Sequence, residues 1–335
     1  MKGFKNILSK HATTVAIDFG VDAIRCVAIE QDSTGSWIRR AAFQLPAMES
    51  DRPMGDKALQ RFREQVRAAG LHGCFCRVTI ASKEFNMEAS RLPALSDREL
   101  SASARFEAID RFGVDPSQVM IRHTSLGEQG TDTRDLLLFS IPTSVIKHAT
   151  RAAIHAGLSP CSVEHSACAA LRGVEHWKSG THEGIVALLH MEGQQAVLLV
   201  MRDGALASAK SLRGVWTTKI EPANPQQPCH ADTIPLDPVG PEGSWRWSSL
   251  AEETLRGLRQ SCGESSWPNR MIVSGMPADD RDLLETLKGV CGVSVESAGS
   301  SQWLKGTQEI AGDVWASALG ALSRDAHSIG DRRAA

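Results

Sequence analysis

The chain has 335 residues, of which 42% are hydrophobic and 23% are charged. This length, near two average domains, and this balance predict a soluble globular protein with a sizeable core. Its 37 basic and 39 acidic side chains leave a formal net charge of −2, which argues against a broad surface for nucleic acid, although a local basic patch would not show in this average. The sequence holds no run of about 18 apolar residues, the length that a membrane span needs. Residues 1–11 contain lysines but lack an apolar segment and a small-residue cleavage site, so we expect no secretory signal and an intracellular location.

The eight cysteines are scattered along the chain, and without an export signal we expect them to be reduced thiols. Cys74 and Cys76 lie close to His72 at the start of an apolar run. A structural zinc site usually shows two tight pairs of ligands, whereas alternate residues of a strand simply share one face. We therefore expect small, buried or half-buried cysteines here and predict no metal site.

Short apolar runs separated by turn residues open the chain. In the first helical segment, Leu59, Phe62 and Val66 fall on one face and Gly70 ends the helix. The elements expected in this half are strands at residues 15–19, 24–30 and 37–43, a helix at 56–69 and a strand at 76–81.

The same order of elements returns about 170 residues later, which indicates an internal duplication. Asp203-Gly204 is a strong hairpin signal inside this second half. Two such units predict two related α/β halves that face each other. Residues 221–247 carry six of the fourteen prolines and are expected to form a loop. The expected elements are strands at residues 185–191, 196–202 and 205–211, a helix at 249–262, a strand at 271–274, a helix at 278–288, a strand at 293–296 and a last helix at 310–322.

A separate piece, residues 83–157, lies between the halves. Ser96 and Glu99 form a capping box that opens a helix, and Gly157 closes a second one. The piece is small for an independent domain, so we expect it to dock on the first half. Its expected elements are a strand at 85–92, a helix from Ser96 to Phe112, strands at 119–126 and 136–141, and a helix at 143–156.

Two stretches of the sequence resemble known proteins. VAIDFGVDAIRCVAIE, residues 15–30, resembles the first turn of the actin-like ATPase superfamily. The order of phrases from residue 92 to residue 171 resembles the PilM family of type IV pilus assembly proteins, which are relatives of the cell-division protein FtsA. The phrases that carry this resemblance are Leu92-Pro93, Glu107-Ala108, residues 136–141, Ala156-Gly157-Leu158, residues 163–171 and the closing residues 314–322.

The resemblance implies a duplicated actin-like (ribonuclease H-like) fold of two lobes with an FtsA-like β-α-β-β-α insertion. The first lobe would comprise residues 1–82 and 158–182, and the insertion residues 83–157. Residues 183–325 would form the second lobe, and residues 326–335 a disordered tail.

The resemblance also implies a site for ATP and Mg²⁺ between the lobes. The cofactor-binding positions it marks are Asp18, Gly20, Arg25, Gly193 and Gly275. Asp18 and Gly20 match the first phosphate-binding turn of the family, where a tight turn offers backbone N–H groups to an anion. Arg25 stands where a Lys is common.

The second turn departs from the family pattern. His190 takes the place of the family's Asp, and Glu192 takes the place of its Gly. Neutral imidazole is a poor partner for Mg²⁺, which prefers oxygen ligands, and a glutamate adds negative charge where phosphates would lie. Gly193 fits the turn only if the register is shifted by one residue. We therefore predict lost or weak ATP binding, a pseudo-ATPase with no catalytic residue and no resident metal.

The function implied by the resemblance is that of an adaptor on the cytoplasmic face of the inner membrane. In the PilM family the partner is the short cytoplasmic N-terminal peptide of PilN, an inner-membrane protein, and further pilus assembly proteins can join. The family's peptide groove lies between the inserted piece and the first half, which here would involve residues 85–92 and the helix after Ser96.

Three alternatives stay open at this point. The first is a working ATPase whose nucleotide state switches its affinity for the partner. The second is a sugar kinase on the same scaffold, although no segment resembles that family's pattern. The third concerns Trp245 and Trp247, which are either interface anchors in the proline-rich loop or ordinary loop residues.

Overall fold

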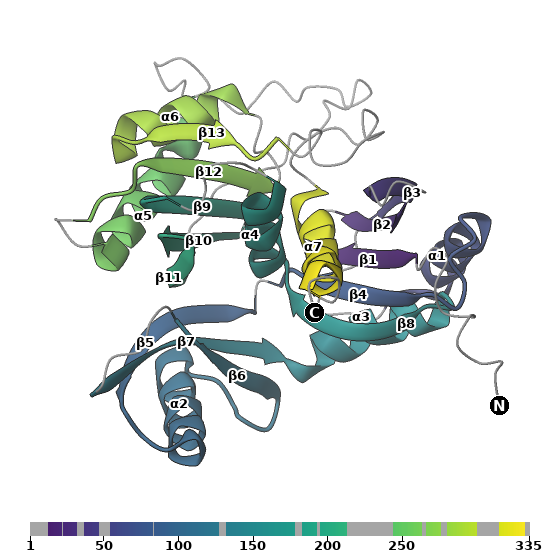
Figure 1. The fold of residues 1–335 in the computed structure, drawn as a ribbon, viewed down its shortest axis with the longest axis horizontal. Coiled ribbons are helices and arrows are strands. Elements are labelled where there is room, and N and C mark those ends of the chain that lie inside the picture. Colours follow the sequence, from purple (N-terminus) through teal and green to yellow (C-terminus); the bar gives the residue numbers. More distant parts are fainter. Residues whose placement is uncertain are drawn as a thin grey trace, which may run out of the picture.

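The computed structural model describes residues 13–21, 23–31, 37–46, 54–82, 84–126, 132–177, 183–192, 195–212, 244–262, 266–275, 280–299 and 315–331. These residues form two β-sheets with helices on their faces. In Figure 1 the smaller sheet lies on the right, the larger sheet extends on the left and below, and helix α7 lies between them. The predicted α/β class is confirmed.

The first sheet has five strands in the order β3-β2-β1-β4-β8. The β1–β2 and β2–β3 pairs are antiparallel, whereas β4 and β8 are parallel to β1. A parallel neighbour needs a crossover connection, which α1 supplies between β3 and β4. Phe62 and Val66 of α1 are buried against this sheet, as the helical spacing predicted. The elements are β1 Thr14–Phe19, β2 Ala23–Gln31, β3 Trp37–Pro46, α1 Asp56–Ala68, β4 Phe75–Ile80 and β8 Ser159–His165.

The second sheet repeats this arrangement. Strands β9, β10 and β11 are antiparallel, and β12 and β13 are parallel to β9. Asp203 (φ 49°) and Gly204 (φ 78°) make the predicted hairpin turn between β10 and β11, since both adopt the positive φ that such a turn requires. The duplicated, two-lobed architecture is therefore confirmed. The elements are β9 Ile185–Glu192, β10 Gln195–Arg202, β11 Ala205–Leu212, α5 Ser244–Cys262, β12 Arg270–Gly275, α6 Arg281–Cys291 and β13 Ser294–Ser297.

The inserted piece joins the second sheet. Glu88 of β5 pairs with Lys210 of β11, which extends that sheet to eight strands in the order β13-β12-β9-β10-β11-β5-β7-β6. Ser96 and Glu99 form the predicted capping box at the start of α2. The elements of the insertion are β5 Asn86–Pro93, α2 Asp97–Phe112, β6 Val119–Ser125, β7 Thr133–Pro142 and α3 Thr143–His155.

The expectation that the insertion docks on the first half holds for α3 and for Phe85, which stacks on His165 of β8. The apolar face of α3, including Val145 and Ala149, is buried in the same core as α1. The sheet of the insertion docks elsewhere, because an unpaired strand edge is satisfied by another strand edge and the edge of β11 is the one that β5 meets. The insertion therefore contacts both lobes.

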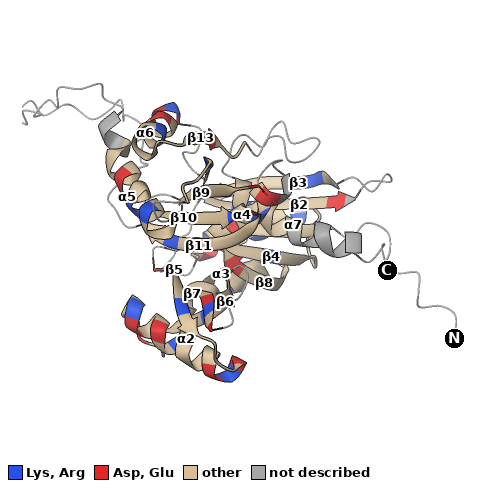
Figure 2. Cartoon of the chain, turned by 60° about the vertical axis from the view of Figure 1, so that its left-hand side comes forward, with Lys and Arg blue, Asp and Glu red and all other residues tan. Residues whose placement is uncertain are grey.

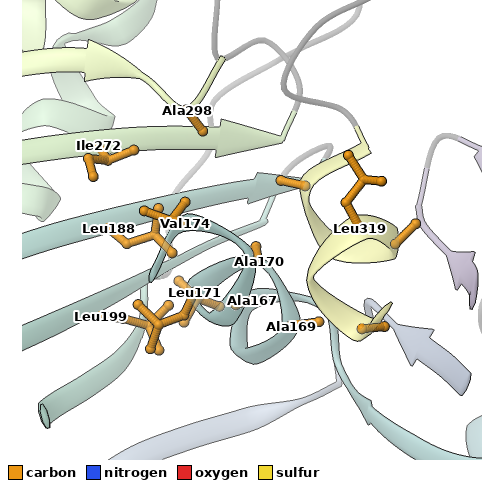
Figure 3. Packing of buried hydrophobic residues seen from close by; sticks show 14 of the residues in the cluster. Ala167, Ala169, Ala170, Leu171, Val174, Leu188, Leu199, Ile272, Ala298 and Leu319 are labelled. Carbon is orange, nitrogen blue, oxygen red and sulfur yellow. The ribbon is translucent and has the colours of Figure 1, made fainter. Parts of the chain in front are cut away.

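Helices α4 (Ser166–Trp177) and α7 (Ala316–Asp331) connect the two lobes. Figure 3 shows Leu171 and Val174 of α4 near Leu188 and Leu199 of the second sheet. The two helices cross closely, because a Cβ atom on Gly320 of α7 would lie 1.7 Å from a main-chain oxygen of α4. Small residues at this crossing therefore set the distance between the helices.

Two boundaries differ from the sequence predictions. Helix α7 continues to Asp331, past the start of the tail that we expected to be disordered from residue 326. Helix α5 begins at Ser244, so the end of the predicted loop 221–247 is helical. Trp247 is fully buried in the core of the second lobe, which excludes it as an exposed interface anchor. The side chain of Trp245 and residues 221–243 lie outside the described residues.

Seven of the eight cysteines lie in the described part of the chain. The seven cysteines described there are free thiols, with Cys76 buried and Cys74 half-buried. Among the same residues, every helix is too short or too polar to cross a lipid bilayer.

Candidate functional site

The site begins at the end of β1, where Asp18 follows a buried apolar run. Its side chain is 1% exposed, and Oδ1 accepts a hydrogen bond from Oγ1 of Thr79 at 2.6 Å. Strand β4 brings Thr79 there because β1 and β4 are parallel neighbours with Asp18 opposite Thr79. A buried carboxylate needs such partners, since an unpaired buried charge is strongly destabilising.

Arg25 supplies the opposite charge. It lies opposite Asp18 in the β1–β2 ladder, and its Nη1 is 3.5 Å from Oδ2 of Asp18. Arg25 is only 2% exposed, so this guanidinium is a fixed internal cation. In the turn between these strands, the N–H of Gly20 donates to the carbonyl of Ala23 at 3.0 Å, so this backbone donor is already used inside the protein.

The second turn contributes His190 and Glu192 of β9, which are 3% and 6% exposed. Oε1 of Glu192 lies 2.8 Å from Nε2 of His190, and Oγ of Ser274 lies 2.8 Å from Nδ1. We assign the ring proton to Nε2, which donates to the carboxylate, so that Nδ1 accepts from the serine hydroxyl. Oγ of Ser317 in α7 lies 3.3 Å from the same Nε2.

The two groups of residues act on each other electrostatically. Burial raises the pKa of Glu192, but the hydrogen bonds from His190 and Ser166 and the charge of Arg25 outweigh burial, so the pKa lies below the usual value for a glutamate. Glu192 is therefore an anion under ordinary conditions. We call Asp18, Arg25, His190 and Glu192, together with Thr79, Ser274 and Ser317, the interlobe network, because they come from both sheets and from α7.

His165 closes the network on the side of the insertion. Burial lowers its pKa to about 3, and the charge of Glu192 compensates only part of this decrease. Its ring stacks on Phe85, with centroids 3.8 Å apart, and its Nδ1 accepts from the N–H of Ala167 at 3.1 Å. His165 is thus a neutral ring that caps α4 and packs against the residue that leads into β5.

The sequence predicted five cofactor-binding residues, and the structure places three of them together, Asp18, Gly20 and Arg25. A fourth, Gly275, lies in a tightly packed position. Asp18 and Arg25 form an ion pair, and Gly20 lies in the adjacent turn. Gly275 ends β12 with φ 88°, and a Cβ there would lie 1.8 Å from the carbonyl oxygen of Met191, so only glycine fits. Gly193 lies outside the described residues.

Sequence reasoning missed the hydroxyl residues of the network. Thr79 and Ser274 each lie one residue before the end of a largely apolar strand, and a polar residue at that position could have marked them. Ser317 carried no comparable signal, because it lies in a helix whose start was not predicted accurately. In the described part of the chain, no group of three His, Cys, Asp or Glu side chains could hold a metal ion.

Comparisons with known proteins identify the fold. No family model matches the sequence, and no curated protein matches it. Among solved structures, a chain of a PilM-PilN type IV pilus biogenesis complex superimposes with a TM-score of 0.69 at 17% identity, covering 92% of this chain and 98% of that one.

Two further structures are less similar. A protein of unknown function from Bacteroides thetaiotaomicron, described as having an actin-like ATPase fold, has a TM-score of 0.49 at 9% identity and covers 89% of this chain and 94% of its own. The activator of 2-hydroxyisocaproyl-CoA dehydratase from Clostridium difficile, with bound ADPNP, has a TM-score of 0.44 at 9% identity and covers 96% and 97%. The resemblance that the sequence shows is thus confirmed in the fold, and the chain has the two-lobed actin-like fold in the form found in PilM.

Proposed function

We propose that this protein is a PilM-like cytoplasmic adaptor of a type IV pilus or a related type II secretion-like assembly. Its partner would be the cytoplasmic peptide of a PilN-like inner-membrane protein, through which it would associate with the membrane. The support is the similarity along nearly the whole length of a PilM chain that was solved as a complex with PilN. The division into a first lobe (1–82 and 158–182), an insertion (83–157) and a second lobe (183–325) belongs to this proposal.

We also propose that the protein has lost ATP binding or retains only weak binding, and acts as a pseudo-ATPase. The observation that carries this proposal is the interlobe network, in which Asp18 already pairs with Arg25 and His190 already pairs with Glu192. The carboxylate of Glu192 would repel a triphosphate, and the charge of Arg25 is already paired with Asp18. His190 offers a nitrogen where Mg²⁺ would need oxygen. The residues present therefore do not fit Mg-ATP.

The alternative is an ATP-binding protein whose nucleotide state switches its affinity for the partner. The observation in its favour is Asp18, which stands at the end of β1 as the family pattern requires. It needs the Asp18–Thr79 and Asp18–Arg25 contacts to open, because both are formed in the structure.

Calorimetric titration with Mg-ATP separates these proposals. An adaptor with a lost site gives no binding heat, and the affinity for the partner peptide is the same with and without Mg-ATP. Tight Mg-ATP binding that Asp18→Ala abolishes would establish the alternative. The adaptor role itself is tested by titrating the protein with a synthetic peptide of the cytoplasmic segment of the PilN-like protein from the same genome. Absence of binding would contradict it.

A further inference from the structure

Helix α3 presents a ridge of basic and apolar side chains to solvent. The residues on its core-facing side are Val145, Ala149, Ala152 and Ala153. Lys147, Arg151 and Ile154 follow one another at steps of about one helical turn, so they share the opposite side of the helix. Lys147 and Arg151 are exposed, and Ile154 is 60% exposed although it is apolar. We call Lys147, Arg151 and Ile154 the α3 ridge.

The two cations of the α3 ridge have no counterion of their own. The sequence contains no acidic residue from 136 to 163, a stretch that includes the whole of α3. Within the part of the chain that the structure describes, neither Lys147 nor Arg151 forms an ion pair. Arg111 of α2, in contrast, is paired with two glutamates. Exposed cations without a counterion attract an anionic partner.

Further cations lie at the end of α3. Helix α1 leads into β4 and α3 leads into β8, and these two strands are parallel, so both helices end at the rim where the strands begin. The N–H of Gly73 donates to the carbonyl of Gly157 at 2.7 Å, which joins the two connections. Arg67, in the last turn of α1, is exposed and, among the described residues, forms no ion pair. The rim therefore extends the positive charge of the α3 ridge.

Acidic residues near this rim are few and partly neutralised. Arg40 of β3 reaches the rim, where it donates to the carbonyl of Gly70, and it pairs with Glu30 of β2 at 3.6 Å. Figure 2 shows the red segment of β2 and the blue segment of β3 side by side. The turn between these strands adds Asp32, which lies outside the described residues. Residues 1–12 lead to Thr13, which accepts from Arg40, and their sequence has three lysines and no acidic residue.

The apolar member of the α3 ridge distinguishes between two kinds of anionic partner. Ile154 lies one turn after Arg151, at the end of the helix next to the rim. The surface of an anionic bilayer offers phosphate groups to cations and, just beneath them, hydrocarbon to an apolar side chain. An acidic polypeptide would complement the cations but leave Ile154 in water. The combination favours a lipid surface.

We propose that the α3 ridge contacts an anionic membrane surface directly, with Lys147 and Arg151 at the lipid phosphates and Ile154 inserted among the headgroups. The contact needs no protein partner, so it goes beyond the proposed adaptor role and does not depend on it. Two cations and one apolar side chain bind a membrane only weakly. A partner in the same membrane would strengthen the contact, because it raises the effective concentration of the protein at the surface.

Co-sedimentation of the full chain with lipid vesicles tests the inference. Vesicles of phosphatidylglycerol and phosphatidylcholine in equal amounts should bind the wild type, vesicles of phosphatidylcholine alone should not, and salt should weaken the binding. The double variant Lys147→Ala/Arg151→Ala should bind about 25-fold more weakly, since each cation near an anionic surface contributes about fivefold. The matched control, Arg98→Ala/Lys288→Ala, removes two exposed cations from α2 and α6. It changes the net charge equally and should bind like the wild type.

A third variant separates lipid from acidic protein. Ile154→Ser should weaken vesicle binding by about fivefold and leave any binding of poly-glutamate unchanged. The changed side chains are exposed, so the variants should keep the circular dichroism of the wild type. The inference is wrong if the wild type does not bind the anionic vesicles, or if it binds poly-glutamate alone. It is also wrong if Lys147→Ala/Arg151→Ala binds vesicles like the wild type, because the contact then lies elsewhere, for example in residues 1–12. Each of these results leaves the adaptor proposal to its own peptide titration.

Discussion

Replacing Glu192 by alanine should destabilise the protein strongly. The carboxylate of Glu192 is 6% exposed and accepts from His190 at 2.8 Å, and its charge lies close enough to Arg25 to act on it. Glu192→Ala removes the acceptor for the imidazole N–H and one of the two carboxylates near the buried guanidinium. Asp18, 3.5 Å from Arg25, then compensates that charge alone.

The expected loss is about 3–5 kcal/mol of unfolding free energy, the range found when one partner of a buried ion pair is deleted. The matched control is Glu285→Ala. Glu285 pairs with Arg281 at 2.9 Å, but these two side chains are 64% and 88% exposed. Such a surface pair contributes at most about 0.5 kcal/mol. Both variants replace a glutamate side chain by a methyl group, so the difference between their losses of unfolding free energy measures the effect of burial.

Urea unfolding, followed by circular dichroism and tryptophan fluorescence, measures both variants. Glu192→Gln separates charge from hydrogen bonding, because the amide oxygen can still accept from His190 while the negative charge is gone. We expect its stability to lie between those of Glu192→Ala and the wild type. A Glu192→Ala variant within about 0.5 kcal/mol of the wild type would show that the network does not stabilise the fold, and the reasoning would be wrong.

Three further predictions follow from the same structure. The pKa of His165 is about 3 in the folded state and about 6.5 in an unfolded chain. The unfolded state therefore gains the proton first as the pH falls. The free energy of unfolding should thus decrease between about pH 6.5 and pH 3. His165→Asn, which keeps an acceptor at the start of α4, should reduce this slope in urea titrations at several pH values. Gly275→Ala should prevent folding or yield insoluble protein, because the added Cβ overlaps a main-chain oxygen of β9; Gly289→Ala, in a helix with open space around it, should raise the unfolding free energy by about 0.5–1 kcal/mol. Gly320→Ala should lower the melting temperature by forcing α4 and α7 apart, and a melting temperature equal to that of the wild type would contradict the close crossing.

The architecture of each lobe was predictable because its signals are local. Apolar runs of strand length, the Asp203-Gly204 turn and the spacing of Phe62 and Val66 each depend on a few neighbouring residues. The duplication was predictable for the same reason, since it repeats local signals in the same order. The capping box of Ser96 and Glu99 likewise lies within four consecutive residues.

The rest depends on contacts that no local pattern encodes. Ser274 and Ser317 are 84 and 127 residues away from His190 in the sequence, so their meeting is a property of the topology. The docking of β5 on β11 was missed because either lobe offered a place for the insertion, and residue periodicity does not choose between strand edges. Trp247 was misplaced because the prolines before it indicated a loop up to residue 247, whereas the helix starts at Ser244.

The interlobe network gives the adaptor proposal a consistent physical basis. In two-lobed proteins controlled by a nucleotide, contacts to the γ-phosphate hold elements in place and are lost on hydrolysis. Here Glu192 and Arg25 approach each other from the two sheets without such a ligand, and β11 and β5 carry the second sheet into the insertion. The arrangement of the two lobes and the insertion is therefore determined by buried side chains and strand pairing. A nucleotide can change the affinity of the protein for its partner only by favouring another arrangement of the lobes. A fixed arrangement of the lobes therefore suits a partner that must stay bound.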